Sequence, residues 1–336
     1  MSEAEARVVV VTGASAGVGR ATIRAFAREG ARVGLIARDT EGLHAAAREV
    51  DQAGGKGLAV PADVADAAQV ESAAVRIEEE LGPIAVWVNN AMVTIFARVV
   101  DITPEEFKRA TEVTYLGTVY GTMAALRRML PRNAGRIIQV GSALAYRSIP
   151  LQAPYCGAKH AIAGFTDSLR TELIHDCKNI YLTMVQLPAM NTPQFTWRRS
   201  KMPRHPQPVP PIFQPEVAAE TIVWASHHKK REIFVGALTV AAIEGNKIAP
   251  TLADRYLGRT GFDSQQTPEP VAANRPDDLF EPVPGDVGAH GEFTEHAHDK
   301  SPVTWLAEHK GTTALASAAV ALGAWYLGRR SCTNKA

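Results

Sequence analysis

The chain has 336 residues, of which 46% are hydrophobic and 21% charged, and its 36 Lys and Arg residues nearly balance its 35 Asp and Glu residues. The formal net charge of +1 argues against a nucleic-acid binder, which usually presents a basic face. The three cysteines, Cys156, Cys177 and Cys332, include no C-x-x-C pair. They favour neither a zinc site nor a disulfide framework, and they suit a reducing compartment. Residues 1–7 are polar and lack the basic start and apolar stretch of a signal peptide, which predicts a cytoplasmic protein.

Short apolar runs alternate with amphipathic stretches over residues 8–235. Most runs are apolar throughout, which is typical of parallel strands covered on both faces. Between them lie helix patterns such as residues 20–28, and Thr103 followed by Pro104 and two glutamates predicts a helix start. The alternation predicts an α/β fold, with one doubly wound parallel sheet and helices on both faces, in a domain spanning residues 1–260. About seven strands are predicted, at residues 8–12, 32–37, 57–60, 84–89, 136–141, 180–186 and 233–235.

Residues 188–215, called the lid below, are rich in proline and basic residues, so they cannot form one regular element. Ligands of open parallel sheets bind at the carboxyl edge of the strands. We therefore expect the lid to be a long loop over a substrate site at that edge. Residues 216–228 and 237–257 return to helix patterns.

The C-terminal region divides into two predicted segments. Residues 261–302 are rich in Pro, Gly, Asp, Glu and His with few large apolar side chains, which predicts a disordered linker. Its histidines, at positions 290, 296 and 298, have no neighbouring cysteine. They are expected to be solvated, and no metal site is predicted.

Residues 303–330 are predicted to form a C-terminal apolar helix. The uncharged stretch within it, residues 311–327, is near the short end of the ~17–25 residues that cross a bilayer. Three interpretations stay open: a marginal membrane anchor, an interfacial helix, or a helix that docks on a partner subunit. Lys310 precedes the stretch and two arginines follow it, so the flanking charges do not settle an orientation.

A glycine-rich turn follows the first predicted strand, in the order Thr12-Gly13-Ala14-Ser15-Ala16-Gly17-Val18-Gly19. Gly13 suits a tight turn, Gly17 allows a pyrophosphate to approach the backbone, and Gly19 allows the helix to pack close to the strand. The helix that begins here offers unpaired N–H groups and the positive end of its dipole to phosphates. The turn therefore predicts a dinucleotide site.

The spacing Gly-x-x-x-Gly-x-Gly resembles the signature of the short-chain dehydrogenase/reductase family, and the resemblance spans about residues 7–245. Asp63-Val64 is similar to the family's adenine-contacting pair, and Asn89-Asn90-Ala91 to its Asn-Asn-Ala-Gly motif, with Met92 in place of glycine. The segment from Pro188 to Thr192 is similar to the family's Pro-Gly-x-x-x-Thr type segment, with Ala189 in place of glycine. The resemblance implies a Rossmann-like fold. It also implies that the cofactor is held by Gly13, Ser15, Ala16, Gly17, Val18, Gly19, Arg38, Asp63, Val64, Asn90, Ala91, Tyr155, Lys159, Pro188 and Thr192.

The end of the second predicted strand bears on the choice between NAD and NADP. A carboxylate there would accept hydrogen bonds from the ribose 2′-hydroxyl and repel a 2′-phosphate. The chain has Ala37 at that point and then Arg38, whose guanidinium suits a phosphate. Ala16 stands where many NADP-preferring members of the family carry a basic residue. NADP is predicted over NAD.

Tyr155 and Lys159 are four residues apart, so on a helix both side chains lie on one face. The ammonium favours the phenolate and lowers the tyrosine pKa from ~10 toward the range of proton transfer. With Ser142, thirteen residues earlier at the end of a strand, the pair matches the family's catalytic motif. The resemblance implies that Tyr155 exchanges the proton, that Lys159 also binds the nicotinamide ribose, and that Ser142 hydrogen-bonds the substrate oxygen.

Thr114 stands where the family usually has an asparagine that holds a water linking the lysine to solvent. A threonine hydroxyl lacks the two separate arms of an amide. We therefore treat Thr114 as a catalytic-site candidate whose presence predicts a slower or rerouted proton relay.

The sequence supports one leading function and two rivals. The leading interpretation is an NADP-dependent oxidoreductase that transfers a hydride between nicotinamide C4 and a carbonyl or secondary alcohol carbon of a small molecule. The rivals are an NADP-binding regulatory or scaffold protein with weak turnover, and a membrane-anchored reductase of a lipid-like substrate. Residues 93–97, 143–152 and 188–213 are expected to line the substrate pocket, where Phe96, Tyr146, Phe195 and Trp197 suggest a non-polar substrate. The resemblance also implies a homodimer or homotetramer, formed through residues 103–130 and 153–176.

Overall fold

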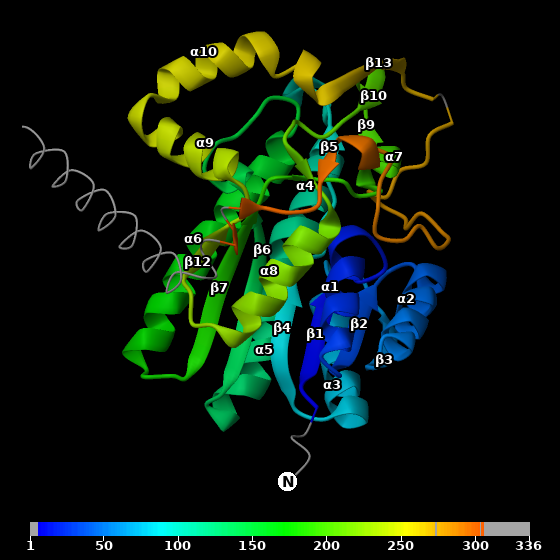
Figure 1. The fold of residues 1–336 in the computed structure, drawn as a ribbon, viewed down its shortest axis with the longest axis vertical. Helices are drawn as coiled ribbons and strands as arrows, with labels where there is room; N and C mark the ends of the chain where they lie inside the picture. The colour runs from blue at the N-terminus through cyan, green and yellow to red at the C-terminus, as the bar shows by residue number, and fades with distance from the viewer. Residues whose placement is uncertain (1–5, 273, 303, 306–336) are drawn as a thin grey trace, which may run out of the picture.

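A computed structural model describes residues 6–272, 274–302 and 304–305 of the chain (Figure 1). One seven-stranded parallel sheet forms its centre, in the strand order β12-β7-β6-β4-β1-β2-β3. The chain starts in the middle of the sheet, builds outward to β3, returns to β4 and then extends the other edge. The strands are β1 (Val8–Thr12), β2 (Arg32–Ala37), β3 (Lys56–Pro61), β4 (Ile84–Asn89), β6 (Gly135–Ser142), β7 (Ile180–Leu187) and β12 (Glu232–Phe234). The predicted doubly wound α/β sheet is confirmed.

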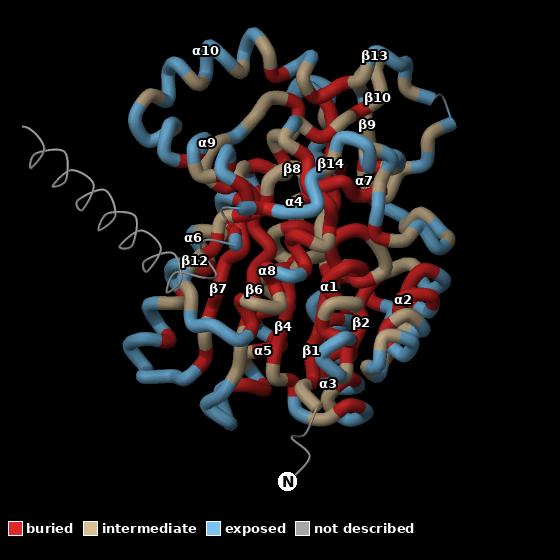
Figure 2. Tube along the Cα trace, viewed as in Figure 1, coloured by how far each residue is buried: buried red, intermediate tan, exposed pale blue. Residues whose placement is uncertain are grey.

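Helices cover both faces of this sheet, and each face has its own apolar core (Figures 1 and 2). Successive side chains of β1 point to opposite faces, so that Val9 and Val11 belong to one core and Val8 and Val10 to the other. The first core is covered by α1 (Gly17–Arg28), α2 (Thr40–Gln52) and α8 (Pro215–His227). The second is covered by α3 (Ala67–Leu81), α5 (Gly117–Arg132) and α6 (Ala153–His175).

The segment before α5 has two helical parts. Helix α4 (Pro104–Thr111) begins with the predicted cap: the Thr103 side chain accepts from the Glu106 N–H at 3.3 Å, and the Glu106 carboxylate accepts from the Thr103 N–H at 2.8 Å. A π-helical turn, η2 (Glu112–Leu116), joins α4 to α5. Such turns are rare and frequently lie at functional sites.

Beyond α8, the single helix pattern expected over residues 237–257 is two helices, α9 (Ala237–Ile248) and α10 (Pro250–Thr260). Pro250 is the reason, because proline destabilises the middle of a helix and suits the first turn of a new one. Both helices lie beyond the carboxyl ends of the sheet strands (Figure 1).

The lid contains only short elements, as its prolines predict. They are β8 (Ala189–Met190), α7 (Gln194–Trp197), β9 (Arg199–Ser200), β10 (Arg204–Pro206) and β11 (Ile212–Phe213). Three lid strands pair with segments outside the lid: β9 with β5 (Ile95–Phe96), β10 with β13 (Gln266–Pro270), and β11 with β14 (Ala297–His298). Strand β8 pairs with β11 within the lid. The lid is therefore held by strand pairs both to β5, which precedes it in the sequence, and to β13 and β14, which follow it.

Residues 261–302 differ from the disordered linker that the sequence predicts. The segment folds back over the carboxyl edge of the sheet, with short 3-10 turns η4 (Asp263–Gln265) and η5 (Thr294–His296) and the two strands already named. Leu279 and Ala289 are buried in it, at 0% and 1% exposure. Two of the three histidines expected to be solvated have partners: His290 pairs with Glu216 at 3.0 Å, and His298 packs against Phe213.

No helix among residues 6–305, apart from the two undescribed positions, is long and apolar enough to span a membrane. The apolar stretch 311–327 lies outside the described residues.

Candidate active site

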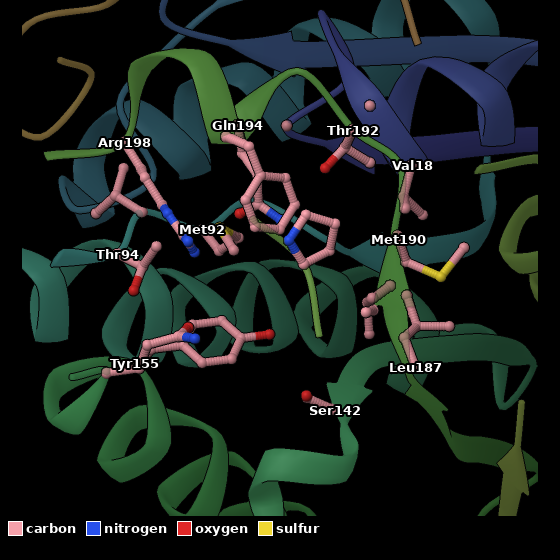
Figure 3. A pocket seen from close by; sticks show the side chains of 18 of the residues that line it. Val18, Met92, Thr94, Ser142, Tyr155, Leu187, Met190, Thr192, Gln194 and Arg198 are labelled. Atoms are coloured by element: carbon pink, nitrogen blue, oxygen red, sulfur yellow. The ribbon is translucent and has the colours of Figure 1, made fainter. Parts of the chain in front are cut away.

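The site is a pocket of about 470 Å³ at the carboxyl edge of the sheet (Figure 3). The glycine turn, the ends of β2, β4 and β6, helix α6 and the lid all contribute to its wall. The pocket therefore brings together motifs that are as much as 179 positions apart, from Gly13 to Thr192. This is where the crevice of an open parallel sheet is expected.

The glycine turn has the geometry that its residues predict. Gly13 has a φ of +66° and donates its N–H to the Ile36 carbonyl at 2.8 Å. A side chain on Gly19 would place a Cβ 2.0 Å from the Gly13 carbonyl oxygen, so only glycine lets the helix start so close to the strand. Ser15, Ala16, Gly17 and Val18 line the pocket beside it.

The motif at the end of β4 holds this turn in place. The Thr12 hydroxyl accepts from the N–H groups of Asn90 and Ala91, at 3.0 and 3.1 Å. The Asn90 side-chain amide in turn donates to the carbonyls of Thr12 and Gly13, at 3.0 and 3.2 Å. Met92, which replaces the family's glycine, lines the pocket.

The predicted adenine-contacting pair, Asp63 and Val64, also lines the pocket. The Asp63 carboxylate forms an ion pair with Arg109 at 2.5 Å and accepts from the Ala65 N–H at 3.0 Å. These two bonds fix the turn after β3, so that it forms one wall of the site.

The three catalytic candidates line this same pocket. Ser142 is the last residue of β6, and its hydroxyl accepts from the Leu144 N–H at 3.1 Å. Tyr155 and Lys159 lie one turn apart on α6, with the Lys159 ammonium 5.4 Å from the centroid of the tyrosine ring. Figure 3 shows the Tyr155 ring and Ser142 on the same side of the pocket.

Burial changes the proton affinities of both ionisable members. Burial of the phenol raises the pKa of Tyr155 to about 12, and a hydrogen bond with Ser142 opposes the rise. Burial lowers the pKa of Lys159 to about 8, because desolvation disfavours the charged ammonium. The ammonium is nonetheless hydrogen-bonded, since its Nζ donates to the Val140 carbonyl at 2.6 Å.

Thr114 lies in the π-helical turn and is fully buried. Its hydroxyl donates to the Val93 carbonyl at 2.9 Å and accepts from the Val93 N–H at 3.2 Å. Its own carbonyl accepts from the Thr118 hydroxyl at 3.0 Å. The residue thus fastens the chain after β4 to helices η2 and α5, and its hydroxyl is engaged by Val93.

At the start of the lid, Pro188 and Thr192 line the pocket as expected. The Thr192 hydroxyl is buried and has no hydrogen-bond partner among the described residues. A Cβ on Gly17 would come within 3.2 Å of the Thr192 side chain, so this threonine stands directly over the glycine turn.

Arg38, predicted to contact a 2′-phosphate, lies at the pocket edge but has other partners. Its Nη1 donates to the Phe280 carbonyl at 2.9 Å, and its Nη2 donates to the Asp278 carbonyl. Both acceptors belong to residues 275–291, called the strap below. Asp39, the next residue, caps α2 by accepting from the Gly42 N–H at 2.7 Å.

The strap also reaches the glycine turn. The Gly288 carbonyl accepts from the Gly17 N–H at 3.1 Å, and Asp286 lies 3.2 Å from the Arg20 guanidinium. The sequence gives little sign of these contacts, because carbonyl acceptors carry no side-chain signature. A 2′-phosphate on Arg38, or a pyrophosphate on the Gly17 N–H, would have to replace carbonyls of the strap.

The residues present fit a nicotinamide dinucleotide. The glycine turn offers a cradle that side chains would fill, and the buried Thr192 hydroxyl faces the pocket without a partner among the described residues. The glycine turn, Asp63-Val64, Asn90-Ala91 and the Tyr155-Lys159 pair form one continuous lining. The strap carbonyls that bond Gly17 and Arg38 are the part of this lining that a bound cofactor would have to displace.

Other expectations for the pocket are only partly met. Of the four aromatic candidates, Phe195 and Trp197 line it. Phe96 is buried at 0% exposure and Tyr146 bonds Glu232 instead. The C-terminal region supplies a part of the wall that sequence reasoning missed, comprising Leu238, Thr239, Ala242, Leu257, Gly261, Ser264, Gln265, Asp278, Pro282, Val283 and Val287.

Residues 7–203 match the family model for short chain dehydrogenases. An uncharacterized oxidoreductase of Bacillus subtilis, YxnA, is 31% identical over 96% of this chain and 91% of its own length. That alignment reaches well beyond residue 203, so it includes most of the lid, α9, α10 and the strap. A 3-dehydrosphinganine reductase of Danio rerio is 32% identical over 64% of this chain and 67% of its own length.

Solved structures show the same fold. A metagenomic short-chain oxidoreductase in complex with NADP is 26% identical, with a TM-score of 0.58 over 68% of this chain and 96% of that chain. A variant of actinorhodin polyketide ketoreductase with NADPH is 26% identical, with a TM-score of 0.62 over 70% of this chain and 97% of that chain. From its family model, its relatives and its fold, this chain belongs to the short-chain dehydrogenase family of oxidoreductases.

Proposed function

We propose that the protein is an NADP-dependent reductase of a carbonyl group, or in reverse a dehydrogenase of the corresponding alcohol, with Tyr155 as general acid and base. The observation that carries the proposal is the presence of Ser142, Tyr155 and Lys159 in one pocket with the glycine turn. A nucleotide site alone would fit many proteins, whereas the added hydroxyl, phenol and ammonium supply what carbonyl reduction requires.

When bound, the nicotinamide supplies or accepts the hydride. The residues of the chain do the remaining work. Ser142 hydrogen-bonds the substrate oxygen and stabilises the negative charge that develops on it. Tyr155 gives its phenolic proton to that oxygen in reduction and takes it back in oxidation. The ammonium of Lys159 stabilises the phenolate left behind, which offsets the effect of burial on the Tyr155 pKa.

Three features support NADP as the cofactor. The second strand ends in Ala37 rather than a carboxylate, Arg38 lies at the pocket edge, and the two structures compared above contain NADP or NADPH. For Arg38 to bind the 2′-phosphate, its guanidinium must exchange the two strap carbonyls for phosphate oxygens. The exchange gives Arg38 stronger hydrogen bonds, because a guanidinium binds a charged phosphate more tightly than a neutral carbonyl.

The proposal is tested with purified protein, NADPH and a panel of ketones and aldehydes, with the loss of NADPH absorbance as the readout. We expect turnover of at least one panel member. Tight NADPH binding without turnover of any member would instead support the rival function, a nucleotide-binding regulatory protein. That rival is favoured by the strap, whose carbonyls already engage Gly17 and Arg38.

A lipid-like substrate is a second alternative for the same chemistry. It is favoured by the aromatic lid residues Phe195 and Trp197 in the pocket and by the similarity to 3-dehydrosphinganine reductase.

Homo-oligomer formation through α4, α5 and α6 is also proposed, because these helices carry exposed apolar side chains such as Phe107, Met123 and Ile174. Light scattering of the purified protein tests the oligomeric state.

A further inference from the structure

The lid carries four basic residues in a short run, and one of them differs from the rest. Arg199, Lys201 and Arg204 all form ion pairs with carboxylates: Arg199 with Glu106 and Asp277, Lys201 with Glu106, and Arg204 with Asp263. Arg198 forms no ion pair with any residue that the structure describes. It is also the most buried of the four, at 2% exposure.

The Arg198 guanidinium lies against two aromatic rings. Its central carbon is 4.7 Å from the ring centroid of Phe96 and 4.4 Å from that of Phe195. Such contacts attract a cation to the ring faces and fix the plane of the guanidinium. They leave its N–H groups unused: Nε and Nη2 are buried and have no hydrogen-bond partner among the described residues.

The guanidinium points into the catalytic pocket. Figure 3 shows Arg198 entering from the lid, on the side of the pocket where Thr94 and Tyr155 lie, and all three residues line it. Thr94 is 2% exposed, and its hydroxyl is a second buried polar group without a hydrogen-bond partner in the described part of the chain. Two buried donors without partners among the described residues, from different segments, therefore line the side of the pocket on which Tyr155 lies.

Buried donors without partners are costly, and a buried cation without a direct ion pair more so. Burial lowers the pKa of Arg198, the charge of Arg275 lowers it further, and the carboxylate of Asp278 opposes this shift only in part. A guanidinium offers two parallel N–H donors that match the two oxygens of a carboxylate. One positive charge beside one neutral hydroxyl matches a carboxylate monoanion better than a phosphate dianion.

We propose that Arg198, with Thr94, binds a carboxylate of the substrate, so that the enzyme acts on oxo acids or the corresponding hydroxy acids. The inference rests on the proposed function and names its substrate class. A hydride from the reduced nicotinamide cofactor and a proton from Tyr155 add across the carbonyl, while the carboxylate itself is unchanged and serves to orient the substrate.

The phosphates of the cofactor are the other anions that could reach this pocket. In Figure 3 Val18, from the glycine turn where a pyrophosphate is expected, lies across the pocket from Arg198 and Thr94. The predicted partner of a 2′-phosphate is Arg38, at the end of β2. Each phosphate thus has its own candidate donors, which leaves Arg198 for the substrate.

The test compares acids with their methyl esters. Levulinate and benzoylformate, each paired with its methyl ester, are given to the wild type and to Arg198→Met with NADPH as reductant. We expect kcat/KM of the wild type to favour the acid of each pair and Arg198→Met to lose roughly 30- to 100-fold on the acids only. Arg199→Met is the matched control, because it removes a neighbouring lid arginine whose partners are Glu106 and Asp277.

A binding measurement keeps the inference testable where turnover fails. Trp197 lines the pocket, so its fluorescence reports on ligands there. We expect benzoate to quench it in the wild type, benzamide to have a weaker effect, and the difference to disappear in Arg198→Met and shrink in Thr94→Val. Such selective binding without any NADPH oxidation would overturn the proposed function and leave the anion site standing.

Three results would overturn the inference. Equal kcat/KM for acid and ester in the wild type, with equal quenching by benzoate and benzamide, removes the anion site. A loss of NADPH affinity in Arg198→Met, with NADH affinity and acid selectivity unchanged, assigns the residue to the cofactor. The proposal expects the melting temperature of Arg198→Met to be higher than that of the wild type. A lower melting temperature, restored in Arg198→Lys with no change in the preference for acids over esters, would assign Arg198 a structural role.

Discussion

The ammonium of Lys159 donates a 2.6 Å hydrogen bond to the carbonyl of Val140, two residues before Ser142 on β6. This bond joins helix α6 to the sheet at the catalytic site. It also holds the lysine in a buried position, which lowers its pKa to about 8. Two predictions depend on this relationship.

The first concerns the pH dependence of the reaction. The charged ammonium is needed to stabilise the phenolate of Tyr155, so kcat/KM for reduction should fall as the pH rises through about 8, the Lys159 pKa. Initial rates with saturating NADPH at a series of pH values provide the measurement. A profile that stays flat up to the pKa of a free lysine would show that this ammonium does not control the reaction.

The second concerns stability. The pKa of Lys159 is lowered from 10.5 to about 8 by folding, so between those values the unfolded chain binds more protons than the folded one. The free energy of unfolding should therefore rise with pH across this window, by roughly 3 kcal/mol. Below the window the full cost of the buried charge remains.

Lys159→Met removes this charge and is the matched variant. We expect it to be inactive, more stable than the wild type at neutral pH, and without the rise in stability above pH 8 that the lysine contributes. Urea unfolding at several pH values measures both chains. If Lys159→Met is less stable than the wild type at neutral pH, the buried charge of Lys159 does not destabilise the fold.

Arg38 provides a test of the cofactor proposal. Removing its guanidinium should weaken NADPH binding by roughly 10- to 100-fold, because charged hydrogen bonds to the 2′-phosphate are lost. NADH lacks that phosphate, so its affinity for Arg38→Ala should equal or exceed its affinity for the wild type. Calorimetric titration of both cofactors measures the difference, and Arg48→Ala, an exposed arginine on α2 outside the pocket, is the control. Equal losses for both cofactors would mean that Arg38 acts only by holding the strap.

Thr114 is expected to matter for stability as well as for proton relay. Its hydroxyl bonds both the carbonyl and the N–H of Val93. Thr114→Val leaves both of those groups unsatisfied in a buried site, so the free energy of unfolding should fall by about 2 kcal/mol. Thr114→Ser keeps the hydroxyl and should lose less. If urea denaturation gives the same stability for Thr114→Val as for the wild type, the two bonds do not contribute.

Much of the fold could be predicted because hydrophobic periodicity and motif order are local. The bounds of β1, β2 and β4 agree with the predicted runs, since each is an apolar segment ended by glycine, charge or asparagine. The bounds were less accurate where a strand continues into polar residues, as β6 does to Ser142.

The strap and Arg198 could not be predicted, for physical reasons. Residues 261–302 have few apolar side chains, but Leu279 and Ala289 are buried, and Arg38 and Arg109 donate to backbone carbonyls of the segment. Every residue has a backbone carbonyl, so the amino-acid composition does not show which of them accept hydrogen bonds. Arg198, in turn, stands in a basic run of the lid, where a charged residue is expected to be solvated. Only tertiary structure distinguishes it from its paired neighbours.

The proton role of Tyr155 and the hydride role of the site are tested together by isotope transfer. NADPH carrying deuterium at both hydrogen positions of nicotinamide C4 is incubated with a carbonyl substrate, and the alcohol product is analysed by mass spectrometry for the wild type and for Tyr155→Phe. The account predicts one deuterium on the product carbon with the wild type, and product formation reduced by about 10²–10⁴-fold with Tyr155→Phe while NADPH still binds. Product without deuterium, or equal product formation by the two proteins, would contradict it.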